Sequence, residues 1–272
     1  MSVPSLELPE PSQSTLRSAR ALLRRKERKQ AGRFLVEGRQ AVREALGVPG
    51  VVEAVFFHWA SAHDNVDLIE LAAAGSVPYF GVSEQNLGTM TDTVTPQGVV
   101  AVARDMDVPL DEVLADDLSL VVVCAQVRDP GNAGTVIRCA DAAGADAVIL
   151  SSDSVEVYNP KTVRASVGSI FHLPVVVGVD LAEAISACRA RGLQIFATDG
   201  ASGTDLTDLG DELARPTAWV MGNESWGLPV EHLELADRTV AVPIYGKAES
   251  LNLATAAAVC LYASATAQRA KS

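Results

Sequence analysis

Several kinds of sequence feature are missing from this 272-residue chain, and each absence removes a class of protein. No apolar run approaches the ~18 residues that a membrane-spanning helix needs, which excludes an integral membrane protein. The stretch from Met1 to Ser14 is rich in Pro, Ser and Glu and lacks the basic and apolar regions of a signal peptide. We therefore expect a cytoplasmic protein that is not secreted.

The cysteines are few and far apart. Cys124, Cys139, Cys188 and Cys260 include no CxxC pair, so we predict reduced, mostly buried thiols rather than disulfides or a zinc site. The four histidines form no cluster at the spacing of metal ligands. We accordingly expect no bound metal.

The common glycine-rich and catalytic signatures are absent as well. No two glycines are separated by a single residue, so the chain has neither a GxG dinucleotide loop nor an ordinary methyltransferase glycine loop. The patterns GxxxxGK(S/T), HExxH and GxSxG do not occur either. The missing GxG loop counts against a nucleotide-binding oxidoreductase.

Positive charge is scarce overall but concentrated in one place. With 22 Lys and Arg against 34 Asp and Glu, the net charge is −12, which by itself argues against a nucleic-acid partner. From Arg17 to Arg43, however, ten basic residues face two acidic ones, so this stretch carries +8 and the remainder −20. Such asymmetry fits either a local polyanion-binding patch or a solvated basic helix.

The length and composition leave room for two domains. Hydrophobic residues make up 48% of the chain, enough for a substantial core, and ~150 residues per domain gives one large domain or two modest ones. An acidic stretch at 105–117 divides the pattern, and we interpret it as a linker. It would separate a domain at 16–104 from one at 118–272, with a disordered tail at 1–15.

The region before the linker is predicted to be a compact α/β domain. Short apolar runs predict strands at Val51–Phe57, Pro78–Phe80 and Val99–Val102. Helical spacing of apolar residues predicts helices at Glu37–Leu46 and Asp67–Ala74.

The region after the linker alternates regularly between strands and helices. Continuous apolar runs, typical of strands buried on both faces, occur at Leu120–Ala125, Ala147–Leu150, Pro174–Val177, Gln194–Ala197, Ala218–Met221 and Thr239–Val242. The helices expected around them are Thr135–Ala143, Asn159 to about Ser169, Ala182–Ala190 and Ser250 to about Ala265. This order predicts a doubly wound, mostly parallel sheet, whose ligands bind beyond the carboxyl ends of its strands.

Three polar segments punctuated by glycine follow predicted strands. They are Asp129–Arg138, Met221–Pro229 and Val242–Leu253. Asn132 can cap the helix of the first segment, with Arg138 about two turns further along. Each polar residue taken alone could serve only a structural purpose, such as a helix cap or a salt-bridge partner. Three such segments at the ends of buried strands together predict a functional site.

The motifs in these segments resemble those of a known family. Asn132-x-Gly134-x-x-x-Arg138, Gly222-x-Glu224-x-x-Gly227 and Pro243 … Glu249-Ser250-Leu251-Asn252 are similar, in order and spacing, to the three motifs of SpoU/TrmH RNA 2′-O-ribose methyltransferases of the knotted SPOUT superfamily. The resemblance covers about Leu118 to Gln268. A second stretch resembles the family's N-terminal substrate-binding domain, through Phe34-Leu35-Val36-Glu37-Gly38 and Thr95-Pro96-Gln97-Gly98-Val99-Val100.

The resemblance implies an enzyme with a trefoil-knotted α/β catalytic domain behind a smaller α/β RNA-binding domain. It implies S-adenosylmethionine as cofactor, a homodimer, and methyl transfer to a ribose 2′-hydroxyl of RNA, with 23S ribosomal RNA favoured over transfer RNA. A non-catalytic RNA-binding or ribosome-assembly factor of the same fold is the alternative. It is disfavoured because none of the polar motif positions has been replaced.

The resemblance also assigns roles to individual residues. The catalytic positions fall on Asn132, Arg138, Glu224, Ser250 and Asn252, and the cofactor positions on Thr198, Gly222, Val242, Ile244 and Leu251. The charge pattern adds candidate RNA-binding residues, namely Arg24, Arg25, Lys26, Arg28, Lys29 and Arg33. By the resemblance, Lys161 and Arg164 would contact RNA phosphates; as plain sequence they would be helix-surface charges. Arg138 would either take the hydroxyl proton, which needs a strongly lowered pKa, or stabilise the developing alkoxide or grip a phosphate. Trp226 would either stack on a base or pack in a core or interface.

Overall fold

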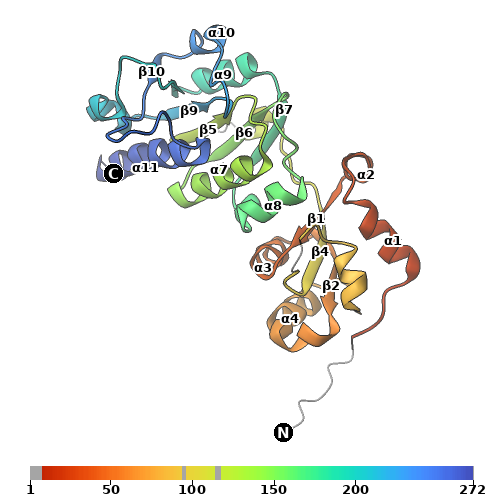
Figure 1. Cartoon of the computed structure of the whole chain (residues 1–272). Helices are drawn as coiled ribbons and strands as arrows, with labels where there is room; N and C mark the ends of the chain where they lie inside the picture. Colours follow the sequence, from red (N-terminus) through yellow and green to blue (C-terminus); the bar gives the residue numbers. More distant parts are fainter. Residues whose placement is uncertain (1–7, 94–95, 114–117, 272) are drawn as a thin grey trace. The chain divides into compact units, whose positions relative to one another are not determined.

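The computed structural model describes residues 8–93, 96–113 and 118–271. The chain divides into two compact units, an N-terminal unit (Met1–Met106 with Tyr158–Phe171) and a C-terminal unit (Asp107–Val157 with His172–Ser272), drawn in Figure 1. The boundary after Met106 lies close to the start of the expected linker. Residues 158–171, which the expected division kept with the rest of 118–272, pack instead with the N-terminal unit.

The N-terminal unit is built on a four-stranded sheet of order β1-β4-β2-β3. Its strands are β1 (Arg33–Glu37), β4 (Val99–Arg104), β2 (Val52–His58) and β3 (Tyr79–Val82). β4 is antiparallel to both of its neighbours, whereas β2 and β3 are parallel. The sequence predicted β2, β3 and β4 to within two residues and did not predict β1.

Helices cover both faces of this sheet (Figure 1). They are α1 (Gln13–Ala21), α2 (Arg25–Ala31), α3 (Arg39–Gly47), the 3-10 helix η1 (Trp59–Asn65), α4 (Val66–Ala74) and α5 (Glu84–Gly88). Leu16 of α1 and Leu87 of α5 pack into one cluster with Phe56 of β2. α3 and α4 contact each other and the sheet.

The tail predicted to be disordered through residue 15 is shorter than expected. Residues 1–7 lie outside the described part of the chain, but Leu8 is buried and the carbonyl of Pro9 accepts a hydrogen bond from Gly81 N at 2.9 Å. Ser12 then caps α1 by accepting from Thr15 N at 3.1 Å. The prediction was wrong for residues 8–15 because Leu8 is buried, Pro9 bonds to β3 and Ser12 starts a helix.

Residues 158–171 form α8 (Pro160–Ser166) and a 3-10 turn at Ser169–Phe171. As predicted, Asn159 caps α8, accepting from Lys161 N at 2.9 Å, and Pro160 occupies the first turn. The ring of Phe34 in β1 stacks on Tyr158 and Phe171, with centroids 4.4 and 6.2 Å apart. These contacts make the segment part of the core of the N-terminal unit.

The C-terminal unit contains the predicted parallel sheet. Its six strands run in the order β10-β8-β9-β5-β6-β7, and every neighbouring pair is parallel. The strands are β5 (Leu120–Cys124), β6 (Ala147–Ser151), β7 (Val175–Val179), β8 (Gln194–Thr198), β9 (Thr217–Met221) and β10 (Arg238–Val240). The doubly wound α/β class predicted from the sequence is confirmed.

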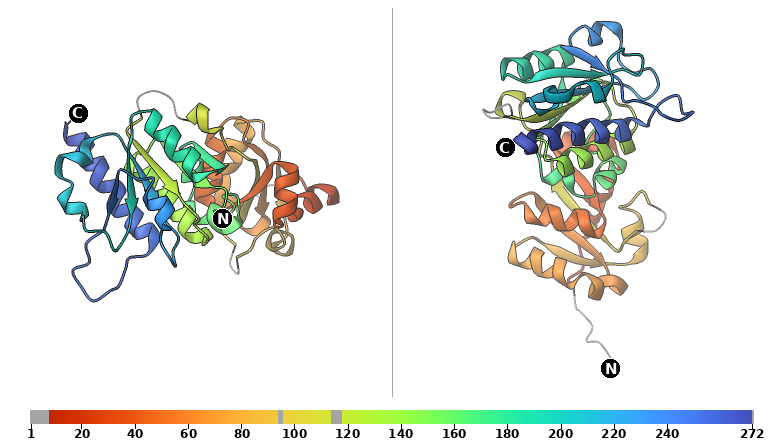
Figure 2. Two further views of the ribbon diagram at one scale, coloured as in Figure 1. Left: turned by 90° about the horizontal axis from the view of Figure 1, so that it is seen from above. Right: turned by 90° about the vertical axis from the view of Figure 1, so that its left-hand side faces the viewer.

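Helices flank this sheet on both faces. α7 (Pro130–Ala143) and α11 (Leu253–Lys271) lie side by side (Figures 1 and 2), and the buried indole of Trp219 in β9 donates to Ser264 Oγ of α11 at 2.9 Å. α9 (Leu181–Ala190) and α6 (Leu110–Val113) pack into the cluster on the other face. Shorter elements are the 3-10 turns Leu206–Asp208 and Gly210–Ala214 and helix α10 (Val230–Leu233).

The expected linker at 105–117 is partly folded. α6 lies inside it, and Val113 is buried in the core of the C-terminal unit, while residues 114–117 lie outside the described part of the chain. The prediction of unpaired thiols is confirmed, because all four cysteines are free and three are buried. None of the described helices is long and apolar enough to cross a membrane.

Candidate active site

The three polar segments meet because of the strand order. β9 lies between β5 and β8, and β10 is the next strand beyond β8. Since parallel strands end at the same edge of a sheet, the loops after β5, β8, β9 and β10 lie together there. The site is therefore assembled from residues that are far apart in the sequence.

The helix of the first segment, α7, begins at Pro130, five residues earlier than predicted. Asp129 is the N-cap, accepting from Asn132 N at 2.9 Å, and Pro130 fills the first helical position. The prediction that Asn132 caps this helix was therefore wrong. Because the cap is Asp129, the Asn132 side chain is left free to bind elsewhere.

The second segment is a closed turn after β9. The backbone N–H and carbonyl of Asn223 bond to the carbonyl and N–H of Gly227 at 2.8 and 2.9 Å. Gly222 fits only as glycine, because a Cβ atom there would lie 2.5 Å from the carbonyl carbon of Gly227. Gly227 itself has a φ of 69°, in the region that favours glycine.

The Glu224 carboxylate in this turn binds the first segment. It accepts hydrogen bonds from Arg128 N at 3.2 Å, Asp129 N at 3.1 Å and Asn132 Nδ2 at 3.1 Å. Partial burial would raise the pKa of Glu224, but hydrogen bonds from its own N–H and from these three donors outweigh burial and hold the pKa below its usual value. Glu224 is thus an ionised anchor for the loop, poorly suited to accept a proton.

The third segment joins the network through Asn252. Its Nδ2 donates to Asn132 Oδ1 at 2.9 Å, while its Oδ1 accepts from Ala254 N at 2.9 Å and caps α11. The predicted start of this helix at Ser250 was wrong, because the helix begins at Leu253 and Asn252 is its cap. One line of hydrogen bonds therefore connects all three segments.

The sequence alone did not single out the residues that support this network. Asn223 is buried, and its Nδ2 donates to the carbonyl of Gln126 at 2.8 Å while its Oδ1 accepts from Ser225 N at 2.8 Å. Gln126 has a φ of 56°, which non-glycine residues rarely adopt. The only sequence signal for Asn223 was its place between Gly222 and Glu224.

A cavity of about 270 Å³ lies at these loops. It is lined by Thr198, Asp199, Gly200, Gly222, Asn223, Glu224, Ser225, Gly227, Val240, Val242, Ile244, Glu249, Ser250, Leu251, Leu253 and Ala256. All five residues expected to bind the cofactor are in this set. Three lining residues are acidic and none is basic, so the wall favours a ligand that carries positive charge.

The catalytic candidates Ser250 and Arg138 differ from the other three in having no place in the network. Ser250 is exposed and lines the cavity. Arg138 is exposed on α7, six residues beyond Asn132, and makes no hydrogen bond or ion pair with any residue that the structure describes. Its guanidinium group is not held by the fold.

Several of the predicted RNA-binding residues are engaged inside the N-terminal unit. Arg28 is 4% exposed, and its Nη1 donates to the carbonyls of Leu22 and Leu23 at 2.9 and 2.8 Å, so its assignment to RNA was wrong. Arg33 pairs with Glu53 at 2.8 Å. Arg164 pairs with Glu37 and Asp92 at 3.3 and 3.2 Å.

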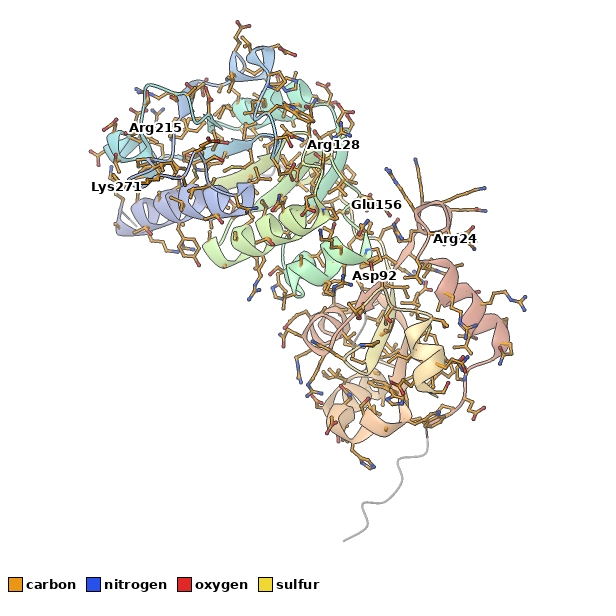
Figure 3. The ribbon with its side chains drawn as sticks, in the orientation of Figure 1. Arg24, Asp92, Arg128, Glu156, Arg215 and Lys271 are labelled. Atoms are coloured by element: carbon orange, nitrogen blue, oxygen red, sulfur yellow. The ribbon has the colours of Figure 1, made fainter. Side chains whose placement is uncertain are left out.

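The remaining basic candidates are exposed. Arg24, Arg25, Lys26 and Lys29 lie on or next to α2, and Lys161 lies on α8. Figure 3 labels Arg24, whose side chain is 72% exposed and approaches Glu27 at 3.7 Å. The exposed cations of the basic stretch are therefore concentrated around α2. Such a surface can bind phosphates.

Comparisons with known proteins agree with this geometry. The family models, relatives and solved structures that match the chain place it among the S-adenosylmethionine-dependent RNA 2′-O-ribose methyltransferases. The SpoU rRNA Methylase family model matches residues 119–262, and the MRM3-like substrate binding domain matches residues 13–101. The chain belongs to the SpoU rRNA methylase family. It is 37% identical over 238 residues to the 23S rRNA (guanosine(2553)-2′-O)-methyltransferase RlmP of Bacillus subtilis, covering 88% of this chain and 90% of that protein.

Solved structures show the same fold with the cofactor present. The SpoU methyltransferase AviRb of Streptomyces viridochromogenes in complex with AdoMet superposes with a TM-score of 0.80 at 31% identity, covering 96% of this chain and 100% of that one. An AdoMet-bound rRNA methyltransferase of Sinorhizobium meliloti gives a TM-score of 0.79 at 31% identity, over 94% and 96% of the two chains. S-Adenosylmethionine is therefore the cofactor. The residues described here contain no group of three or more His, Cys, Asp or Glu placed to hold a metal ion.

Proposed function

We propose that this enzyme methylates a ribose 2′-hydroxyl of 23S ribosomal RNA. The observation that carries the proposal is the line of hydrogen bonds from Glu224 through Asn132 to Asn252, beside an acidic-walled cavity. The relative RlmP supports ribosomal RNA as the substrate, because it matches along both units of the chain. The match of an MRM3-like substrate binding domain supports it as well. Such an RNA substrate would place the enzyme in the cytoplasm.

The test is to map 2′-O-methyl sites in total RNA from cells with and without the gene. One site in 23S rRNA should disappear in the deletion strain and return with the wild-type gene, but not with Arg138→Ala. A missing site in transfer RNA would show that the substrate is a different RNA. An unchanged map would contradict the assignment to 23S rRNA.

The residues that line the cavity suit S-adenosylmethionine in polarity and charge. The volume of the cavity is just below the ~300–1,000 Å³ typical of ligand pockets. Val242, Ile244 and Leu251 offer an apolar wall for an adenine ring, and Thr198 and Gly222 would lie against the nucleoside. The carboxylates of the lining suit the positive charge of a sulfonium and an ammonium group. When bound, the cofactor supplies an electrophilic methyl group on a good leaving group.

The protein residues then have to position the hydroxyl and manage its proton. We assign Arg138 to the substrate, because its guanidinium is exposed and held by no hydrogen bond or ion pair within the described ranges. As a cation, the guanidinium would stabilise the developing alkoxide or hold the neighbouring phosphate. Ser250, exposed in the cavity wall, would orient the hydroxyl by a hydrogen bond. The three loops are held in their relative positions by Asn132, Glu224 and Asn252.

We assign RNA docking to the exposed cations of α2. Arg24, Lys26 and Lys29 present charge to solvent in a chain whose net charge is −12. Cations concentrated on one helix would attract the phosphates of RNA. The acidic rest of the chain would then lie away from the bound RNA.

We further propose that the enzyme works as a homodimer with a trefoil-knotted C-terminal unit. Val259 and Tyr262 of α11 are 39% and 50% exposed, an apolar surface that a second copy would cover. Val259→Asp should convert the dimer to a monomer by light scattering. Membership of the SpoU family supports the knot.

A further inference from the structure

Two exposed aromatic side chains border the cofactor cavity without forming part of its wall. Trp226 is 58% exposed and Tyr245 is 89% exposed. Trp226 lies between the lining residues Ser225 and Gly227, and Tyr245 directly follows the lining residue Ile244. Both rings therefore project to solvent from the loops that enclose the cavity.

The turn that carries Trp226 is held rigidly. The paired backbone bonds of Asn223 and Gly227 close it, and Asn223 Oδ1 fixes Ser225 N. The same turn directs the Glu224 carboxylate onto the loop after β5 and leaves the indole exposed. A backbone that is already fixed loses little conformational entropy when the side chain that it carries binds a ligand.

The polar tips of both rings are also unused. Among the residues that the structure describes, Trp226 Nε1 and Tyr245 Oη have no hydrogen-bond partner. Lys247, two residues beyond Tyr245, is exposed as well. An aromatic face beside a cation is the combination with which proteins bind unstacked nucleotides.

We propose that Trp226, with Tyr245, is a stacking platform for the bases next to the nucleotide that is methylated. The proposal rests on RNA methylation at this cavity, because a 2′-hydroxyl reaches the cavity only if the RNA backbone passes its mouth. Bases splayed out at that point need a flat apolar surface, and every base has a face that stacks on an aromatic ring. Trp226 and Tyr245 supply such surfaces from two adjacent loops.

The surroundings favour RNA over a second copy of the chain at this place. The core of a protein interface is depleted of charged residues. Here the two loops carry the exposed charged residues Glu224, Lys247 and Glu249. The exposed apolar side chains of α11 form a more suitable surface for another copy.

The first test measures RNA binding by the full chain. The probe is a fluorescein-labelled, unstructured single-stranded RNA oligonucleotide followed by anisotropy. Trp226→Ala should raise its Kd about fivefold to 150-fold, whereas Trp226→Phe should keep most of the affinity. Val230→Ala, which trims an exposed apolar side chain four residues away, is the control and should leave the Kd unchanged. The Kd for S-adenosylmethionine should stay within about twofold in all variants.

The second test uses the fluorescence of Trp226 itself. The chain has three tryptophans, of which Trp219 is fully buried. RNA should therefore quench emission in Trp59→Phe, where Trp226 is the only exposed indole left, and should fail to quench it in the double variant Trp59→Phe, Trp226→Phe. Quenching that persists in the double variant, or that never occurs in Trp59→Phe, overturns the proposal.

The third measurement separates RNA from a second copy as the occupant. Trp226→Ala and Tyr245→Ala should keep the molar mass of the wild type in light scattering. A loss of mass in these variants would show that the rings form a contact between copies and would overturn the proposal. Failure of the proposed 23S substrate is read separately, from the 2′-O-methyl map, because oligonucleotide binding does not depend on which RNA is methylated.

Discussion

The side-chain amide of Asn252 donates to Oδ1 of Asn132 at 2.9 Å, although 120 residues separate the two. This bond links the start of α11 to the first turn of α7. It also fixes the orientation of the Asn132 amide, whose Nδ2 must then face Glu224. The family motifs are thus mutually supporting parts of one framework, and the cavity beside them depends on it.

Asn252→Asp tests this framework because it keeps one function of the residue and removes the other. The aspartate still caps α11, but it places an oxygen against Asn132 Oδ1 where a donor stood. We expect kcat/KM for RNA to fall by at least about tenfold, or ~1.4 kcal/mol. The melting temperature should change by less than ~4 °C, because the cap is retained.

The control for this prediction is Asn252→Ala, which loses both the cap and the donor. Its melting temperature should fall further than that of Asn252→Asp, since losing a cap costs about 1 kcal/mol. Wild-type kcat/KM in Asn252→Asp would show that the bond to Asn132 is not needed for methyl transfer.

Glu224→Gln should change how stability depends on pH. The pKa of Glu224 is lowered in the folded chain, so its ionised form stabilises the fold above its ordinary pKa of 4.5. That contribution is lost as pH falls through the lowered folded value. The free energy of unfolding of the wild type should therefore decrease as the pH falls below about 5. The free energy of unfolding of Glu224→Gln should decrease less steeply over the same range.

The measurement is urea unfolding at a series of pH values. At pH 7 we expect Glu224→Gln to cost about 1 kcal/mol, discounted for the exposure of the carboxylate. Glu231→Gln, seven residues further on in α10, is the matched control. Equal slopes in the two variants would mean that the hydrogen bonds to Glu224 contribute nothing.

Much of the C-terminal unit could be predicted from the sequence because its central strands are buried on both faces. A continuous apolar run such as Leu120–Ala125 is long enough for a strand and too short for a typical helix, and each of the six runs overlaps an observed strand. The sequence does not predict strand β1, because the helical spacing of apolar residues predicts a helix that begins at Glu37, the last residue of the strand. The actual helix, α3, begins only at Arg39.

The contacts of single side chains were less predictable. Asn132 and Asp129 are both good cap residues, and only the structure shows that Asp129 takes that position. The burial of Arg28 could not be predicted from the sequence either, because a run of basic residues is typical of a solvated surface. The turn formed by Leu22 and Leu23 presents two carbonyls that need a donor, and Arg28 supplies it.

Arg138→Ala should abolish most of the methyl transfer without harming the fold. An exposed guanidinium with no hydrogen bond or ion pair to the described residues contributes little to stability. Removing a group that stabilises developing negative charge typically lowers kcat by ~10²–10³-fold. Radiolabel transfer to RNA measures the rate, and calorimetry should show that S-adenosylmethionine still binds.

Arg138→Lys distinguishes the two roles considered for this residue. If the group removes a proton, the lysine variant should regain activity as pH rises toward the pKa of a lysine, ~10.4. If it stabilises charge, the lysine variant should keep partial activity that is independent of pH. A near-wild-type rate in Arg138→Ala would contradict both roles.

The triple variant Arg24→Ala, Lys26→Ala and Lys29→Ala should weaken RNA binding and reduce its salt dependence. Each lost phosphate contact lowers the slope of log K against log salt by ~0.7, so the slope should fall by about 2. Filter binding at several salt concentrations measures this. Lys271→Ala, at the far end of α11, is the control for loss of surface charge and should leave the slope unchanged.

Arg28→Ala is a second control for the triple variant, taken from the same basic stretch. Removing the guanidinium leaves the carbonyls of Leu22 and Leu23 without this donor, which costs about 1–3 kcal/mol for each buried group. The variant should unfold at lower urea while its salt slope stays that of the wild type. A reduced slope with unchanged stability would show that Arg28 contacts RNA after all.

Phe34→Ala should loosen residues 158–171 together with the N-terminal sheet. The ring of Phe34 stacks on Tyr158 and Phe171, and its loss typically costs ~3–5 kcal/mol. Hydrogen exchange should then speed up in α8 and β1 while β5 and β6 keep their protection. The opposite pattern, with α8 protected alongside β6, would show that the segment belongs energetically to the C-terminal unit. α8 follows β6 in the chain but packs with the N-terminal unit. Its exchange rate therefore shows whether packing or chain connectivity determines the stability of the helix.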